Sequence, residues 1–199
     1  MKIILIGAAG TLGRAIENEL GARHGIIRAG RNGADVKVDI RSIVSVREMY
    51  AQVGKFDAVV SAAGNLHFGA LADMMPEQYA IGLNDKLMGQ INLVIAGQGL
   101  VNDGGSFTLT SGILGHDPIR GGASASMVNA AIDGFVKAAA IELVRGVRIN
   151  SVSPTMLIES AEAYGPYFRG YKPVAAAEAA LAFSKSVEGA QTGKTFHVG

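Results

Sequence analysis

Hydrophobic and polar positions follow two patterns in turn along the chain, and these patterns predict alternating strands and helices. Residues 3–6 form a continuous apolar run, as a strand covered on both faces of a parallel sheet requires. Apolar residues then recur at helical spacing from Leu12 to Leu20, and Gly21 follows as a stop. The same succession repeats and predicts strands at 25–29, 36–40, 56–61, 106–111, 147–152 and 195–198, and helices at 43–53, after Pro76, at 124–145 and at 175–187.

A glycine-rich turn, Gly7-Ala-Ala-Gly-Thr-Leu-Gly13, joins the first predicted strand to the first predicted helix. Glycines let the backbone turn tightly and approach a pyrophosphate, and the helix N-terminus points free N–H groups at the anion. Because 27 glycines in 199 residues produce such spacings by chance, the position between strand and helix is the stronger signal. It predicts a dinucleotide-binding site.

Strands that alternate with helices imply a parallel sheet with right-handed crossover connections. The expected fold class is therefore α/β, a Rossmann-type doubly wound parallel β-sheet in three layers. No linker or low-complexity stretch interrupts the chain, which predicts a single NAD(P)-binding domain over residues 1–199.

Composition narrows the classes of partner. A net charge of +1 gives no electrostatic case for nucleic acid or an anionic membrane, and zero cysteines exclude disulfides and thiolate metal sites. No His pair has metal-ligand spacing, so no metal site is expected. The apolar run before Gly7 is too short for a signal-peptide core, and no run reaches membrane-spanning length. We expect a cytoplasmic protein that binds neither nucleic acid nor membrane.

Seven segments with a common order suggest a known family. They are the glycine-rich turn, Val38-Asp39-Ile40, Ser61-Ala-Ala-Gly64, Lys86-Leu-Met-Gly89, Thr110-Ser111, the helix from Ser124 to Glu142, and Arg148-Ile-Asn-Ser-Val-Ser-Pro154. Over essentially its whole length the chain resembles the short-chain dehydrogenase/reductase family. The resemblance implies a nicotinamide cofactor, a small-molecule substrate and a substrate lid, here short and placed around 155–173.

The cofactor half of the family pattern is well preserved. Asp39 matches the acid that holds the adenine amino group, although an acid at a helix N-terminus is an alternative interpretation. Ala63 and Gly64 match the small residues beside the adenine ribose, and Pro154-Thr155 replaces the usual Pro-Gly at the nicotinamide end. The resemblance implies a cofactor site made of Gly7, Ala9, Gly10, Thr11, Leu12, Gly13, Arg31, Asp39, Ile40, Ala62, Ala63, Gly64, Pro154 and Thr155.

Charge after the second predicted strand indicates which cofactor is bound. An NAD site offers a carboxylate to the ribose 2′-hydroxyl, whereas an NADP site offers a cation to the 2′-phosphate. The chain has Gly30-Arg31-Asn32 there, with no acid before Asp35. Arg31 therefore favours NADP over NAD. Arg14 is a second candidate cation, for which we favour a solvated position.

The catalytic half of the family pattern is altered. Family members carry a Tyr and a Lys four residues apart on the helix that here spans 124–145, and a Ser at the end of the preceding strand. The resemblance assigns Ser111 to the Ser position. One alignment places Ala125 and Asn129 at the Tyr and Lys positions, and a second places Ala123 and Met127 there. Neither restores the pair.

Lys86 suggests a replacement for the missing pair. It stands where the family has an Asn, although Asn84 is a competing assignment. We predict that Lys86 is the cation at the nicotinamide end and a candidate proton donor; the alternative is a solvated helix lysine. Other candidate donors are His116, a water molecule and the lid tyrosines Tyr164, Tyr167 and Tyr171. His67 and Phe68 are candidates for the border of the pocket.

Three functions follow as expectations. The leading one is an NADP-dependent oxidoreductase that acts on a small carbonyl or alcohol. The second is a catalytically silent NADP sensor, and the third an isomerase or dehydratase that uses the cofactor structurally. We also expect a homodimer or homotetramer through the helices after Pro76 and after Ser124, because apolar residues exceed one stripe there: Leu93, Ile95, Val128, Ile132, Phe135 and Ile141.

Overall fold

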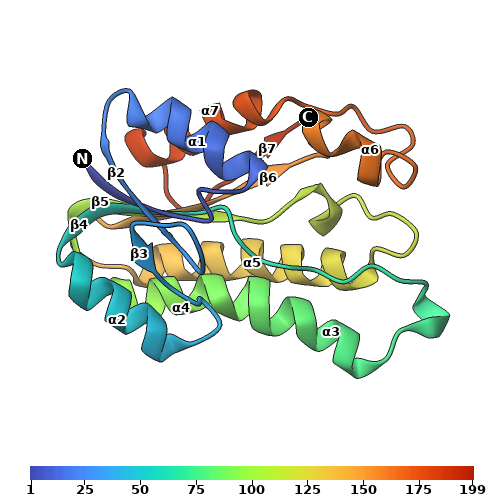
Figure 1. Ribbon diagram of the computed structural model, residues 1–199, viewed down its shortest axis with the longest axis horizontal. Coiled ribbons are helices and arrows are strands. Elements are labelled where there is room, and N and C mark those ends of the chain that lie inside the picture. Colours follow the sequence, from blue (N-terminus) through green and yellow to red (C-terminus); the bar gives the residue numbers. More distant parts are fainter.

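The computed structural model describes residues 1–199 and contains one seven-stranded sheet in which every neighbouring pair is parallel. The strand order is β3-β2-β1-β4-β5-β6-β7, which confirms the predicted doubly wound fold (Figure 1). The strands are β1 Lys2–Ile6, β2 Gly25–Gly30, β3 Val36–Lys37, β4 Phe56–Ser61, β5 Val101–Thr110, β6 Arg148–Pro154 and β7 Thr195–Val198.

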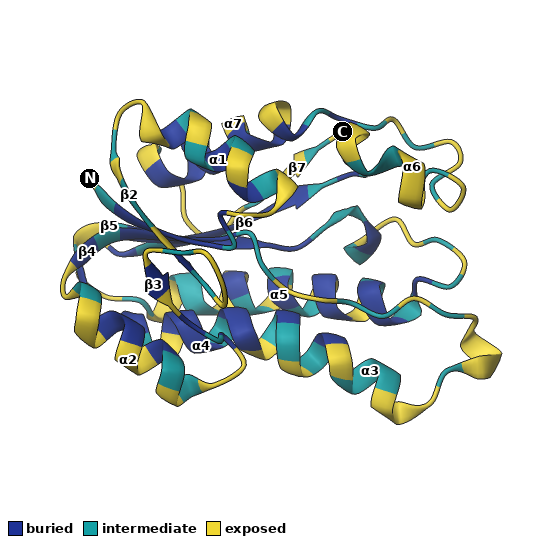
Figure 2. Cartoon of the chain, in the orientation of Figure 1, coloured by how far each residue is buried: buried dark blue, intermediate teal, exposed yellow.

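Helices cover both faces of the sheet and make three layers (Figure 1). Helices α1 and α7 pack on one face, and α2, α4 and α5 on the other. Figure 2 shows buried residues along the strands and exposed ones on the outer faces of the helices. The helices are α1 Thr11–Gly21, α2 Ile43–Val53, α3 Pro76–Gly82, α4 Met88–Gly97, α5 Ala123–Glu142, α6 Ala161–Tyr164 and α7 Ala176–Glu188.

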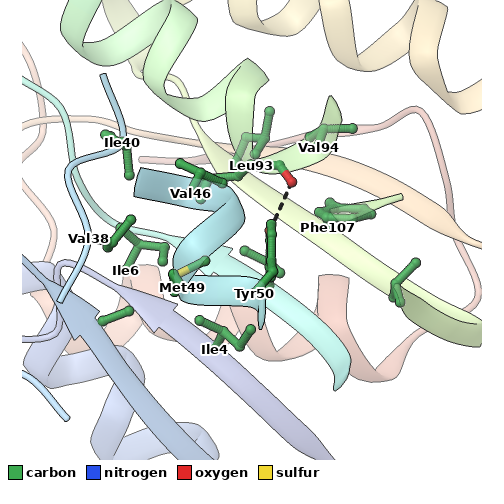
Figure 3. Close-up of a cluster of buried hydrophobic side chains, with 14 of the residues drawn as sticks. Ile4, Ile6, Val38, Ile40, Val46, Met49, Tyr50, Leu93, Val94 and Phe107 are labelled. Carbon is green, nitrogen blue, oxygen red and sulfur yellow. Dashed lines mark hydrogen bonds between the residues drawn. The ribbon is translucent and has the colours of Figure 1, made fainter. Parts of the chain in front are cut away.

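The larger hydrophobic core lies between the sheet and the α2, α4 and α5 layer. Tyr50 is its largest polar-tipped member, and its hydroxyl donates to the Leu93 carbonyl at 2.8 Å (Figure 3). Its ring stacks on Phe56 with centroids 5.0 Å apart. Burial raises the pKa of Tyr50, so the phenol stays protonated and remains a hydrogen-bond donor inside the core.

The third strand is shorter than predicted. Val38 and Ile40 are buried as their alternation predicts, but β3 ends at Lys37. The Asp39 backbone N–H donates to the Ser45 hydroxyl, and the Asp39 carbonyl accepts from Ser42, the N-cap of α2. These bonds turn the chain into the helix before the strand extends further.

The predicted helix after Pro76 is divided. Between α3 and α4 the chain forms a π-helical segment, residues 83–87, and this segment carries Lys86. The extra residue per turn changes the direction in which side chains point, so a constant period of 3.6 fails here. The remaining differences shift element ends, the largest being β5, which starts at Val101 instead of Ser106.

The strand order reverses beside β1, because β2 lies on one side of it and β4 on the other. In open α/β sheets such a switch point leaves a crevice beyond the carboxyl ends of the strands. The glycine-rich turn after β1 and the residues after β4 both lie at this crevice. No helix is long and apolar enough to span a membrane.

Candidate functional site

The glycine-rich turn requires glycine at two positions for steric reasons. Gly7 has a φ of +82°, and a Cβ there would lie 2.7 Å from the Ala62 carbonyl oxygen. A Cβ on Gly13 would overlap the Gly7 carbonyl, so the absence of a side chain lets α1 start close to β1. No side chain caps the N-terminus of α1, whose first turn carries no acid. Its N–H groups therefore remain available to an anion.

A cavity of about 670 Å³ lies over this turn and runs along the ends of β2 and β4. It brings together most of the predicted cofactor residues. Thr11, Leu12 and Gly13 lie in the first turn of α1, outside the lining, and Pro154 and Thr155 lie at the end of β6. The predicted residues that line the cavity are Gly7, Ala9, Gly10, Arg31, Asp39, Ile40, Ala62, Ala63 and Gly64.

Four arginines line the cavity, and they differ in their partners. Arg28 is paired with Asp35 at 2.6 Å, and Arg41 with Asp39 at 2.6 Å. Arg14 and Arg31 make no ion pair. The cavity therefore carries two arginines without an ion-pair partner, and these are available to an anionic ligand.

The two acids that are hydrogen-bonded to Arg28 and Arg41 are held as carboxylates. Hydrogen bonds from Arg28 lower the pKa of Asp35 to about 2, and Asp35 does not line the cavity. The Arg41 guanidinium lowers the pKa of Asp39, which does line it. Ser42, not Asp39, caps α2, and the Asp39 carboxylate accepts from the backbone and side chain of Arg41.

Lys86 is buried beside Ser111 and Asn129. Its Nζ donates to the Ser111 carbonyl and to Asn129 Oδ1, each at 2.7 Å, and its side chain joins the π-helical segment to α5 and the loop after β5. Burial lowers the pKa of Lys86 to about 8. The alternative of a solvated lysine is therefore wrong, whereas the competing residue Asn84 is exposed.

Ser111 is buried at the carboxyl end of β5, with its backbone N–H bonded to the Val152 carbonyl and its Oγ 3.5 Å from the same oxygen. Ala125 is fully buried in α5 and brings no hydroxyl to the site. Asn129 contacts Lys86, whereas Met127 is exposed. The geometry therefore favours the alignment that pairs Ala125 with the Tyr position.

Gly64 connects this cluster to the cavities. Its φ is +135°, and a Cβ there would lie 2.5 Å from Lys86 Cγ, so Lys86 packs directly over its backbone. Gly64 and Asn65 line both the large cavity and a second one of about 330 Å³. The second cavity lies between residues 64–68 and residues 156–168, where the rings of Phe68 and Tyr164 are 6.1 Å apart. His67 does not line it.

Three of the other candidate proton donors, His116, Tyr167 and Tyr171, make no hydrogen bond to Lys86 or Ser111, whereas Tyr164 lines the second cavity. His116 is exposed and stacks edge-on against His197, with ring centroids 4.5 Å apart. Tyr167 is exposed, and the Tyr171 hydroxyl donates to the Asp117 carbonyl at 3.1 Å. Thr155 is buried, and its hydroxyl has no partner within the protein.

Asn129 is a site residue that the sequence patterns did not single out for a role. In the sequence, Asn129 stands out only as the residue that replaces the family Lys. Its partner Lys86 is 43 residues away in the chain, so the contact is not apparent from local spacing. A signal was present: Asn129 is polar in an alanine-rich helix and stands four residues after Ala125, on the same helix face.

A family model and several solved structures match the chain over essentially its whole length. The model of the enoyl-(acyl carrier protein) reductase family matches residues 13–198. A solved structure of a Listeria innocua protein is 53% identical, with both chains covered completely and a TM-score of 0.98. A small-chain dehydrogenase solved in complex with NADPH is 22% identical, with 100% of this chain and 96% of that chain covered and a TM-score of 0.86. A short-chain dehydrogenase/reductase family protein is 23% identical, with 100% and 95% covered and a TM-score of 0.89.

Proposed function

Because the chain belongs to the short-chain dehydrogenase/reductase family, through the enoyl-(acyl carrier protein) reductase model that matches it, we propose that it is an NADP-dependent oxidoreductase acting on a small carbonyl or alcohol. The observation that carries the proposal is the buried Lys86 amine beside Ser111 and Asn129. It supplies a titratable group where the family's Tyr and Lys are missing.

The cofactor assignment rests on the large cavity. Its glycine-rich turn leaves room for a pyrophosphate close to the backbone, and the uncapped N-terminus of α1 offers N–H donors. Arg31, with Arg14 nearby, is the unpaired cation for a 2′-phosphate. When bound, NADPH supplies the hydride. The known complex of a small-chain dehydrogenase with NADPH supports this choice.

Lys86 is the proposed proton donor. Reduction of a carbonyl needs a proton at the oxygen, and an efficient donor has a pKa near the working pH. A protonated Nζ carries three N–H groups, and the Ser111 carbonyl and Asn129 Oδ1 accept two of them. The third N–H is then the one that is transferred. After transfer, the neutral amine keeps both hydrogen bonds, so its position is held through the cycle.

Ser111 and Thr155 are proposed to position the reacting groups. The Ser111 hydroxyl is the proposed partner of the substrate oxygen, because Ser111 matches the family Ser and its backbone carbonyl holds Lys86 Nζ beside it. The unpartnered Thr155 hydroxyl and the neighbouring Pro154 at the end of β6 are assigned to the nicotinamide end. A buried hydroxyl without a partner is costly, so a ligand that bonds to Thr155 gains affinity.

Deuterium transfer tests the proposal. The protein is incubated with NADPH deuterated at C4 and a cell metabolite extract, and products are searched by mass spectrometry. We expect labelled product from the wild type, a loss of about 10²–10⁴-fold in rate for Lys86→Met, and a reduced rate for Ser111→Ala. Lys137→Met, a change at an exposed lysine of α5, is the matched control and should leave the label unchanged.

A catalytically silent NADP sensor is the second candidate, and the buried Ala125 favours it because no hydroxyl takes the place of the family Tyr. The same experiment separates the two. Bound NADPH without any labelled product supports the sensor and contradicts the reductase.

A further inference from the structure

We propose that the cavity of about 330 Å³ beside Gly64 holds the substrate and selects compact, uncharged, apolar carbonyl compounds, with Phe68 and Tyr164 as its specificity-determining residues. The proposal rests on the proposed function and adds a substrate class to it. Gly64 lines both cavities and packs against the Cα, Cβ and Cγ of Lys86, so one residue of backbone separates the second cavity from the stem of the proposed proton donor.

The lining of the cavity offers no counter-ion to a charged group. It contains no Asp, Glu, Lys, Arg or His. A carboxylate or phosphate inside would lose hydration without meeting a counter-ion, which costs far more than an apolar group would. The polar side chains there are limited, since Asn65 already donates to Asp85 at 2.7 Å. The apolar lining side chains are Leu66, Phe68, Met156, Leu157, Tyr164 and Phe168.

The two aromatic rings come from different segments and face one another. Phe68 follows β4, Tyr164 ends α6, and their planes are tilted by 49°. Figure 1 shows these segments on the same side of the molecule, beyond the carboxyl ends of the strands. Phe68 is 38% exposed and Tyr164 44% exposed, so apolar surface remains for a ligand to bury. Burial of such side chains against a ligand is favourable.

The volume sets the size of the ligand. Ligand cavities are commonly about 300–1,000 Å³, so this one lies at the small end. A single aryl or short alkyl group fills such a volume, whereas the rest of a long acyl chain would extend from its open side into solvent. The expected substrate is therefore a compact ketone, aldehyde or enone without an ionised group.

Binding of two matched probes tests this inference without turnover. Acetophenone and 4-acetylbenzoate differ by one carboxylate, and their dissociation constants are measured by ligand-observed NMR with NADP⁺ present and absent. We expect acetophenone to bind at least about tenfold more tightly. Phe68→Ala and Tyr164→Ala should each weaken it about fivefold or more. Tyr167→Ala, a control at an exposed tyrosine that does not line the cavity, should change it less than twofold.

Phe68→Arg adds a test by gain of binding. An arginine there supplies the missing counter-ion, so 4-acetylbenzoate should bind as tightly as acetophenone or more so. Equal binding of the two probes by the wild type, or equal effects of Tyr164→Ala and Tyr167→Ala, overturns the assignment of the cavity. Probe binding without hydride transfer to any compound contradicts the reductase but leaves the cavity assigned. Hydride transfer to charged substrates alone supports the reductase and contradicts the assignment of the cavity.

Discussion

Lys86 and Asn129 occupy each other's expected places. The family resemblance leads one to expect an asparagine at 86 and a lysine at 129, and here the lysine projects from the π-helical segment to meet the asparagine on α5 at 2.7 Å. The two residue types are thus exchanged, and the amine comes from the π-helical segment instead of from α5. An amine in that position, with a pKa of about 8, suits proton transfer near neutral pH.

The pH dependence of reduction follows from this pKa. Burial favours the neutral amine, so the fraction of protonated Lys86 falls as the pH rises through about 8. We expect the rate of reduction to be constant below that pH and to fall tenfold per unit above it, with the opposite trend for alcohol oxidation. The measurement is single-turnover hydride transfer between pH 6 and 10.

Lys86→Arg is the informative variant for this profile. An arginine keeps its charge throughout the range, so the break at about 8 should disappear even if some activity survives. A break that stays in place in Lys86→Arg would assign the titration to another group and contradict the role of Lys86.

Arg31 carries the second prediction at this scale. It is unpaired in the large cavity, and a charged hydrogen bond to a phosphate is worth about 1.5–3 kcal/mol. Arg31→Ala should therefore weaken NADPH binding by about 10–100-fold and leave NADH binding within twofold. Calorimetric titration with both cofactors measures this, with the exposed Arg47, outside the cavity, as the control site for Arg47→Ala. An equal loss for both cofactors would assign Arg31 a structural role.

The sequence predicts these residues unequally well. The glycine-rich turn and Arg31 follow from local order along the chain, since strand, turn and helix are neighbours in sequence. The burial of Lys86 does not, because its partners lie 25 and 43 residues away and the lysine itself suggests an exposed position. The position of Lys86 is set by contacts between segments that are distant in the chain, and composition and local spacing do not predict such contacts.

At the scale of elements, one side chain joins the segment after β6 to the last helix, α7. No side chain from its own N-cap protects α7, but the Glu159 carboxylate accepts from the Ala176 N–H, at 3.0 and 3.1 Å. A bridge between Leu157 and Val174 lies beside it. Leu157 and Ser160 flank Glu159 in the chain and line the proposed substrate cavity. The cap therefore fixes one wall of that cavity.

Glu159→Ala should loosen this wall. Loss of a helix cap costs about 0.5–2 kcal/mol, and we expect the free energy of unfolding to fall by that amount. Hydrogen exchange in residues 156–168 should accelerate, and acetophenone binding should weaken. Glu159→Gln keeps an acceptor oxygen, so its stability, exchange rates and acetophenone affinity should lie between those of the wild type and of Glu159→Ala. Exchange rates equal to those of Glu162→Ala, a change at a nearby exposed residue without a bond, would contradict the cap.

The sequence predicts elements best where burial is strong on both sides. Continuous apolar runs such as Ile3 to Ile6 mark the central strands correctly. The edge strand β3 and the π-helical segment are missed in extent or type, because backbone bonds from Asp39 and one extra residue per turn leave no trace in the apolar period. Both irregularities lie next to the site.

At the scale of the whole molecule, the candidate site residues lie at the carboxyl ends of neighbouring strands of the sheet. The glycine-rich turn, Gly64 and Ser111 follow β1, β4 and β5, and these are adjacent strands in the order β1-β4-β5. The large cavity and the smaller one share Gly64 at this end of the sheet. The amino ends of the strands and the outer faces of the helices thus have no role in the proposed reaction.

The prediction of a homo-oligomer through α4 and α5 now rests on fewer apolar residues of these helices. Leu93, Val128 and Ile132 are buried in the core of one chain, so their use as excess apolar residues was wrong. Two others are exposed, Ile95 by 49% and Ile141 by 87%. Both helices lie on the same side of the sheet, so a two-fold axis can cover these residues together.

Charge at those two positions tests the oligomer. If α4 and α5 form the interface, a glutamate at each position must be buried without a partner, and the double variant Ile95→Glu/Ile141→Glu should raise the dissociation constant by about 100-fold or more. Light scattering should then report a monomer. Leu181→Glu, at a residue of α7 that is 56% exposed, should leave the mass unchanged. A wild-type monomer at working concentration contradicts the prediction, and a lower mass for Leu181→Glu alone moves the interface to the α7 face.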